Sequence, residues 1–136
     1  MILTHIPLDN EQEAVQVYLT DLTRKSLDEL HDKLIQQMKD KNLNNIVLHI
    51  DKKYPFLSPY AKTTFLKIFA TLAIYNKKIF IALVANNHLQ SITLRGLLQA
   101  RLKETKSLSL EINLFSNQQT TLAWLNEKNN PASSGQ

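Results

Sequence analysis

The 136-residue sequence contains no cysteine, which excludes disulfide bonds and chemistry that depends on a thiolate. It has only two glycines, Gly96 and Gly135. Loops that hold phosphate groups through backbone N–H donors need several glycines, so nucleotide-binding loops of the Walker and Rossmann types are excluded as well. No serine lies in a G-x-S-x-G motif, which argues against the nucleophile arrangement of the α/β-hydrolases.

Long apolar runs are also missing. The longest apolar-rich stretch, 65–75, is too short to span a bilayer and is interrupted by lysine and threonine. Met1 is followed by a short apolar run and then by polar residues, so we expect no signal peptide. The absence of cysteine fits a reducing compartment. We therefore expect a soluble, cytoplasmic protein that does not span a membrane.

Positive charge is in excess but is spread along the chain. The formal net charge is +4, and pairs such as Lys52–Lys53 and Lys77–Lys78 stand near the ends of expected elements. Only three residues are arginine. A nucleic-acid groove would combine arginines with aromatic side chains on one surface, so we do not expect nucleic-acid binding.

The four histidines, His5, His31, His49 and His88, lie in separate segments and lack the spacing that places two metal ligands on one helix face. We therefore expect no metal and no cofactor. His49 lies within an apolar strand segment, where we expect it to be hydrogen-bonded in the core or at the strand end. Asp51 follows the same segment, at the sheet edge where open α/β sheets hold ligands, and is either a ligand contact or a loop residue.

Short apolar segments alternate with helical ones along the chain. Apolar, β-branched runs predict strands at 2–6, 14–19, 46–50, 77–84 and 109–115. Helical periodicity predicts helices that begin near 26, 59, 86 and 116. This order predicts an α/β fold with a mostly parallel sheet of about five strands, the first antiparallel through a hairpin, and about four helices. A single domain would cover 1–127, followed by a disordered polar tail at 128–136.

Local signals predict helix starts and faces. Ser26 and Glu29 have the spacing of a capping box at the first helix, and Ser116 and Gln119 have it at the last. Gly96 lies inside the third helix and weakens it. The apolar side chains of this helix that we expect to point inward are Leu89, Ile92, Leu97 and Leu102.

The segment FLSPYAKTTF, 56–65, joins the central strand to the second helix. Ser58 suits the N-cap, because its hydroxyl can accept from an unpaired helix N–H, and Pro59 suits the first helical position. A helix start can also hold an anion or border an interface. The apolar arc of this helix is wider than the usual ~100°, which indicates either additional core packing or a partner.

Four segments, in this order, are similar to those of one known family. VQVYLTDLTRKSLDEL resembles its second strand, loop and first helix, and NNIVLHID resembles its central strand. YPFLSPYAKTTFL resembles its hallmark turn, in which an apolar pair and Asp-Ser-Ser/Thr-Gly precede a helix. FSNQQTTLAWL resembles its closing strand end and helix. Over nearly its whole length the chain thus resembles a STAS domain (sulfate transporter and anti-sigma factor antagonist).

In phosphorylatable STAS domains, a serine or threonine at this helix start accepts phosphate from a partner kinase, an anti-sigma factor, and a phosphatase removes it. By the resemblance, Ser58 falls on the family's Asp and Pro59 on the phosphoacceptor. Tyr60 falls on the next Ser/Thr and Ala61 on the Gly, and extra residues occur around 52–54. Proline has no hydroxyl, so the resemblance implies the scaffold of the switch without its acceptor. Ser58, in a shifted register, is the candidate phosphoacceptor.

The resemblance further implies a non-enzymatic regulatory or docking module of bacterial signalling. Its partner would be an anti-sigma factor kinase, a phosphatase or the ATPase of a lipid-transporting ABC complex; a second copy of the chain is a further candidate. The family's contact face would here consist of Lys52, Lys53, Tyr54, Ser58, Pro59, Tyr60 and Lys62. Lysines would steer an acidic partner and tyrosines would supply contact area, unless these are ordinary solvated loop residues.

Two other functions stay open. SLDELHDKL, NNIVLHID, KKIFIALVANNHL and AWLNEKNNP have a faint resemblance to the crotonase-type acyl-CoA enzymes, although the glycine-rich oxyanion loops and the length of that family are missing. A small-ligand or nucleotide binder would instead use the carboxyl edge of the sheet near Asp51, Asn86 and Asn87.

Overall fold

The regular alternation of apolar and amphipathic segments is realised as alternating strands and helices. The computed structural model describes residues 1–9, 11–41, 43–75, 77–104 and 110–130. Within these ranges the elements are β1 (Ile2–Pro7), β2 (Glu13–Leu19), α1 (Arg24–Lys41), β3 (Asn45–Ile50), α2 (Pro59–Ala73), β4 (Ile79–Val84), α3 (His88–Glu104), β5 (Leu110–Phe115) and α4 (Gln118–Lys128).

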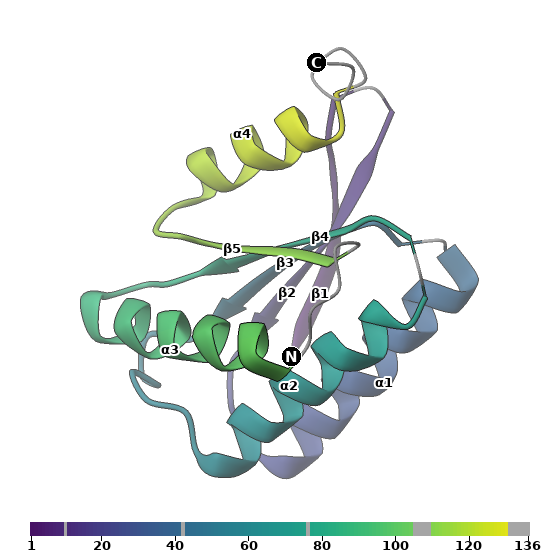
Figure 1. Cartoon of the computed structure of the whole chain (residues 1–136). Helices are drawn as coiled ribbons and strands as arrows, with labels where there is room; N and C mark the ends of the chain where they lie inside the picture. The colour runs from purple at the N-terminus through teal and green to yellow at the C-terminus, as the bar shows by residue number, and fades with distance from the viewer. Residues whose placement is uncertain (10, 42, 76, 105–109, 131–136) are drawn as a thin grey trace.

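The described strands form a five-stranded sheet in the order β1-β2-β3-β4-β5. β1 is antiparallel to β2 and the other neighbours are parallel, which confirms the predicted α/β fold with its first strand added by a hairpin. Each parallel pair is joined by a helix. Since right-handed crossovers that advance in one direction leave their helices on the same face, α1, α2 and α3 lie together, while α4 lies on the opposite face (Figure 1).

Two cores flank the sheet. β3 and β4 are buried along their whole length, as their continuous apolar runs predict. Alternate side chains point to opposite faces, so Leu48 joins the core under α1, α2 and α3, and Val47 joins the core under α4. In the second core, the Trp124 ring of α4 lies 6.0 Å from the Phe80 ring and 5.3 Å from the Phe115 ring.

The N-terminus of α1 corrects one expected capping box. The helix begins at Arg24, before Ser26, and Thr23 Oγ1 accepts a hydrogen bond from the Ser26 N–H at 3.2 Å. Asp21 accepts from the hydroxyl and the N–H of Thr23 at 2.8 and 3.1 Å. Hydrogen bonds from the side chains of Ser26 and Thr23 lower the pKa of Asp21 to about 2. Thr23, and not Ser26, thus accepts from an unpaired N–H of the first helical turn.

The predicted cap of α4 is also wrong, by one residue. Asn117 is the N-cap, and its Oδ1 accepts from the Thr120 N–H at 2.8 Å. An asparagine caps a helix as well as a serine does, and here it follows Ser116 directly. Two adjacent cap-forming residues therefore left the sequence pattern ambiguous.

The third helix is rotated relative to its prediction. Leu89 and Ile92, which were expected to point inward, are 50% and 52% exposed. Leu97 is buried as predicted, and the side chain of Leu102 lies outside the described residues. The buried stripe consists of Gln90, Leu94, Leu97 and Arg101. These residues recur at helical spacing, so two polar side chains point inward where the apolar pattern predicted leucine and isoleucine.

The end of α4 overlaps the start of the predicted tail. Lys128 Nζ lies 2.9 Å from Glu111 Oε1, and the amide of Asn129 donates to Asn45 Oδ1 at 2.7 Å. Residues 128–130 are thus part of the described structure, whereas the rest of the predicted tail, 131–136, lies outside it. Among the helices that the structure describes, none has the length and apolarity needed to cross a bilayer.

Candidate functional site

The loop between β3 and α2, residues 51–58, is anchored by one buried side chain. Gln90 of α3 is 1% exposed, and its amide group donates to the carbonyl oxygens of Ile50, Asp51 and Tyr54 at 3.2, 3.1 and 3.1 Å. Its Oε1 accepts from the Asn86 N–H at 2.8 Å. These bonds satisfy Gln90 in the interior and explain the rotation of α3.

Further polar groups of the β4–α3 segment bond to the same loop. The side-chain amides of Asn86 and Asn87 donate to the carbonyl oxygens of Ile50 and Lys52 at 2.5 and 3.2 Å. Asp51 Oδ1 accepts from the Lys53 N–H at 3.0 Å. The side chains expected to hold a small ligand at this edge are therefore engaged in building the loop, which weakens the small-ligand hypothesis.

The hydroxyl of Ser58 caps α2, as the sequence predicts. Ser58 has extended backbone angles, and its Oγ accepts from the Ala61 N–H at 3.1 Å. Pro59 occupies the start of the helix, where its missing N–H costs no hydrogen bond. The Ser58 side chain is exposed at the surface, so the junction is not sealed in the interior.

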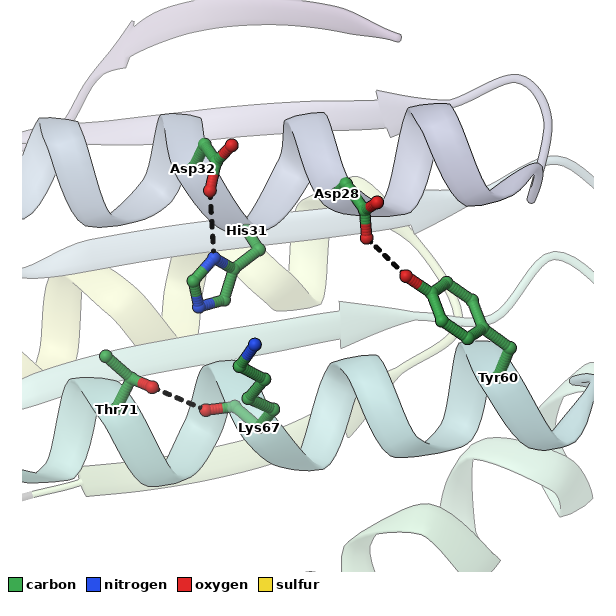
Figure 2. Close-up of polar contacts among 6 residues, drawn as sticks. All are labelled: Asp28, His31, Asp32, Tyr60, Lys67 and Thr71. Atoms are coloured by element: carbon green, nitrogen blue, oxygen red, sulfur yellow. Dashed lines mark hydrogen bonds and ion pairs between the residues drawn. The ribbon is translucent and has the colours of Figure 1, made fainter.

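Tyr60 points away from this loop and toward α1 (Figure 2). Its hydroxyl donates to Asp28 Oδ1, and the Arg24 guanidinium lies 4.5 Å from the ring centroid. The hydrogen bond to Asp28 raises the pKa of Tyr60, because ionisation would remove the proton that the hydroxyl donates. Tyr60 thus belongs to the surface shared by α1 and α2 rather than to the loop.

Tyr60 lines a hollow of about 520 Å³ between α1 and α2, bordered by Asp28, His31, Asp32, Tyr60, Thr63, Thr64 and Lys67. His31 Nδ1 lies 3.1 Å from Asp32 Oδ1. Figure 2 shows Lys67 on the opposite helix, with its ammonium group on the side of His31. The hollow carries charges of both signs, and within the described ranges no three His, Asp or Glu side chains come together to hold a metal ion.

The predicted lysines stay on the loop side of the junction. Lys52 and Lys53 are exposed on the anchored loop, and Lys62 is exposed on the first turns of α2. Lys53 Nζ lies 5.4 Å from the centroid of the Tyr54 ring, a cation–π distance. The predicted contact face is therefore divided: Lys52, Lys53, Tyr54 and Ser58 belong to the loop, Lys62 follows it on α2, and Tyr60 faces α1.

Sequence reasoning missed exposed apolar side chains on this loop and on α3. Phe56 is 66% exposed. It borders a hollow of about 210 Å³ together with Leu57, Lys62, Thr93, Gly96 and Leu97. The available signal was the pair Phe56–Leu57 directly before the helix cap, together with the apolar Leu89 and Ile92 that helical periodicity placed in the core.

His49 lies on the other face of the sheet, away from the loop. It is 6% exposed, its ring stacks on Tyr18 with centroids 4.2 Å apart, and its Nε2 lies 3.2 Å from Gln16 Oε1. Gln118 of α4 donates to the same oxygen at 2.7 Å. Burial lowers the pKa of His49. The expectation of a histidine that is hydrogen-bonded in the core is confirmed.

Comparison with known proteins adds no identification to this geometry. Neither a protein-family model nor a curated protein matches the chain.

Proposed function

We propose that the chain is a non-enzymatic docking module that binds a partner protein through the junction of β3 and α2. The observation that carries this proposal is the anchored loop: Gln90 satisfies its carbonyl groups from within, while Lys52, Lys53 and Phe56 are exposed outside. A loop fixed in this way loses little conformational entropy on binding.

The geometry of the helix start favours binding without the standard phosphorylation switch. Pro59 offers no hydroxyl, and the Ser58 oxygen is already bonded to the Ala61 N–H. The pattern resemblance to STAS domains supports a partner of the kinds named above: an anti-sigma factor kinase, a phosphatase or an ABC ATPase. The exposed lysines support an acidic surface on that partner.

Charge reversal at the loop tests this proposal. Lys53→Glu and Lys62→Glu, introduced together, should reduce capture of the partner from lysate of the source cells, because both would repel an acidic surface. We expect a loss of at least about fivefold that shrinks at high salt, as for exposed charges in general.

Lys39→Glu is the control for charge reversal away from the loop, because Lys39 is an exposed lysine near the far end of α1. A protein that is retained by wild type and Lys39→Glu, but lost by the double variant, is the expected result. Equal capture by all three proteins would refute the proposed face.

A further inference from the structure

The anchored loop and the helix that it contacts, α3, carry three exposed apolar side chains: Phe56 on the loop, and Leu89 and Ile92 on α3. Thr93 Oγ1 donates to the Pro55 carbonyl at 2.7 Å, which holds α3 against the residue before Phe56. Phe56, Thr93 and Gly96 border the same hollow. Leu89 and Ile92 precede Gly96 by seven and four residues, so they share its stripe on α3. We call Phe56, Leu89, Ile92 and Gly96 the Phe56 patch.

The fold itself does not explain Gly96. A glycine inside a helix is destabilising, and Gly96 does not occupy a left-handed conformation that would require it. A Cβ atom built at this position would meet nothing within 4 Å, so no neighbouring element needs the space. The absence of a side chain at Gly96 keeps the hollow between Gly96 and Phe56 open.

The charges around the Phe56 patch are mostly positive. Lys62 borders the hollow, and Arg95 lies one turn beyond Ile92 on the same helix. The anchored loop adds Lys52 and Lys53. In segments 51–62 and 87–97, Asp51 is the single carboxylate. An apolar centre with a cationic rim is complementary to an apolar side chain flanked by Asp and Glu.

The backbone groups around the Phe56 patch favour one backbone conformation of its partner over another. The stripe on α3 is the side of a helix, whose N–H and C=O groups are bonded internally. The carbonyl oxygens of Ile50, at the end of β3, and of Asp51 and Tyr54, in the loop, already accept from Gln90. An extended peptide would therefore find few backbone partners here, whereas a helix satisfies its own.

We propose that the Phe56 patch binds an acidic amphipathic helix of the partner protein, with one apolar side chain entering the hollow beside Gly96. This inference rests on the proposed docking function and names the chemistry of the partner. It assigns the apolar contact to Phe56 and α3, and leaves to the lysines the role of orienting the acidic flanks.

The test uses the full chain as bait for a displayed library of random peptides about four helical turns long. Enriched peptides are synthesised and their dissociation constants measured by fluorescence anisotropy. We expect enrichment of Asp- and Glu-rich sequences with apolar residues at i, i+3, i+4 and i+7. Phe56→Ala and Gly96→Ala should each weaken their binding by roughly tenfold or more, and Ile74→Ala, at the exposed far end of α2, should not.

Gly96→Ala separates binding from folding. Alanine favours the helix, so the melting temperature of this variant should rise by about 2–5 °C while peptide affinity falls. Basic or non-helical peptides, no enrichment, or equal affinity of wild type and Gly96→Ala would overturn the inference. Binding that is lost in the Lys53→Glu, Lys62→Glu double variant but kept in Phe56→Ala would overturn the inference alone and leave the docking function standing.

Anionic vesicles form the second arm of the experiment, because an apolar patch with a cationic rim could also meet a lipid surface. The protein should not co-sediment with vesicles of phosphatidylglycerol and phosphatidylcholine at physiological salt. Sedimentation that requires Phe56 would show that the patch binds lipid and would overturn the proposal of a helical partner.

Discussion

At the scale of single residues, Ser58 both caps α2 and is exposed to solvent. Phosphorylation of Ser58 would need the exposure but would compete with the capping hydrogen bond. Its oxygen accepts the Ala61 N–H, and its side chain is exposed next to a proline. The sequence identifies this role correctly, because the Ser-Pro pair at a helix start depends only on local geometry. What local geometry leaves open is where neighbouring side chains point, and Tyr60, two residues on, turns to Asp28 instead of the loop.

The cap makes a direct prediction. Ser58→Ala should lower the free energy of unfolding by about 1 kcal/mol, because the Ala61 N–H loses its partner. Ser58→Asp should retain wild-type stability, since aspartate caps a helix equally well. Urea denaturation followed by circular dichroism measures both. An alanine variant as stable as the aspartate variant would show that the cap contributes nothing.

At the scale of elements, strands and their order follow from sequence more directly than helix rotation does. The buried runs of β3 and β4 are apolar throughout, so their type and burial could be predicted from the residues alone. The rotation of α3 depends on bonds from Gln90 to a loop about forty positions earlier in the chain. Apolar periodicity contains no information on such bonds, so it predicted that Leu89 and Ile92 lie in the core. The Phe56 patch could therefore not be predicted from the sequence.

Gln90 is accordingly the residue whose replacement should release the loop. Gln90→Leu keeps a side chain of similar size but removes the Gln90 donor from the Tyr54 carbonyl oxygen and the acceptor of the Asn86 N–H, so stability should fall by about 1–3 kcal/mol. Amide hydrogen exchange in 51–58 should accelerate as well.

Gln99→Leu, at an exposed position of the same helix, serves as the control and should change neither quantity. Unchanged exchange in the Gln90 variant would mean that the loop is held by other contacts.

At the scale of the whole molecule, the two faces of the sheet are covered unequally. Three helices cover one face, and α4 packs mainly on β4 and β5 of the other (Figure 1). His49 lies where α4 meets the open part of that second face, between Tyr18, Gln16 and Gln118. Its neighbours come from two distant segments, β2 and α4, so the sequence predicts its burial but not its partners.

This position predicts how stability depends on pH. Burial lowers the pKa of His49 below its ordinary value of 6.5, so below pH 6.5 the unfolded chain takes up this proton more readily than the folded chain. The free energy of unfolding should therefore decrease as pH falls from about 7 through 6.5 and continue to fall until the folded state also binds the proton.

Urea titrations between pH 5 and about 8 measure this effect, and His49→Gln, which cannot titrate, should flatten the curve over that range. Identical pH profiles for wild type and variant would show that protonation of His49 does not affect folding.

The anchoring of the β3–α2 loop by Gln90 determines which groups of the loop a partner protein can contact. The carbonyl oxygens of Ile50, Asp51 and Tyr54 already accept hydrogen bonds from Gln90, so discrimination among partners depends mainly on the exposed side chains of the loop. Competing partner proteins would then bind the same fixed loop conformation. The rate at which one replaces another would be set by their dissociation rates.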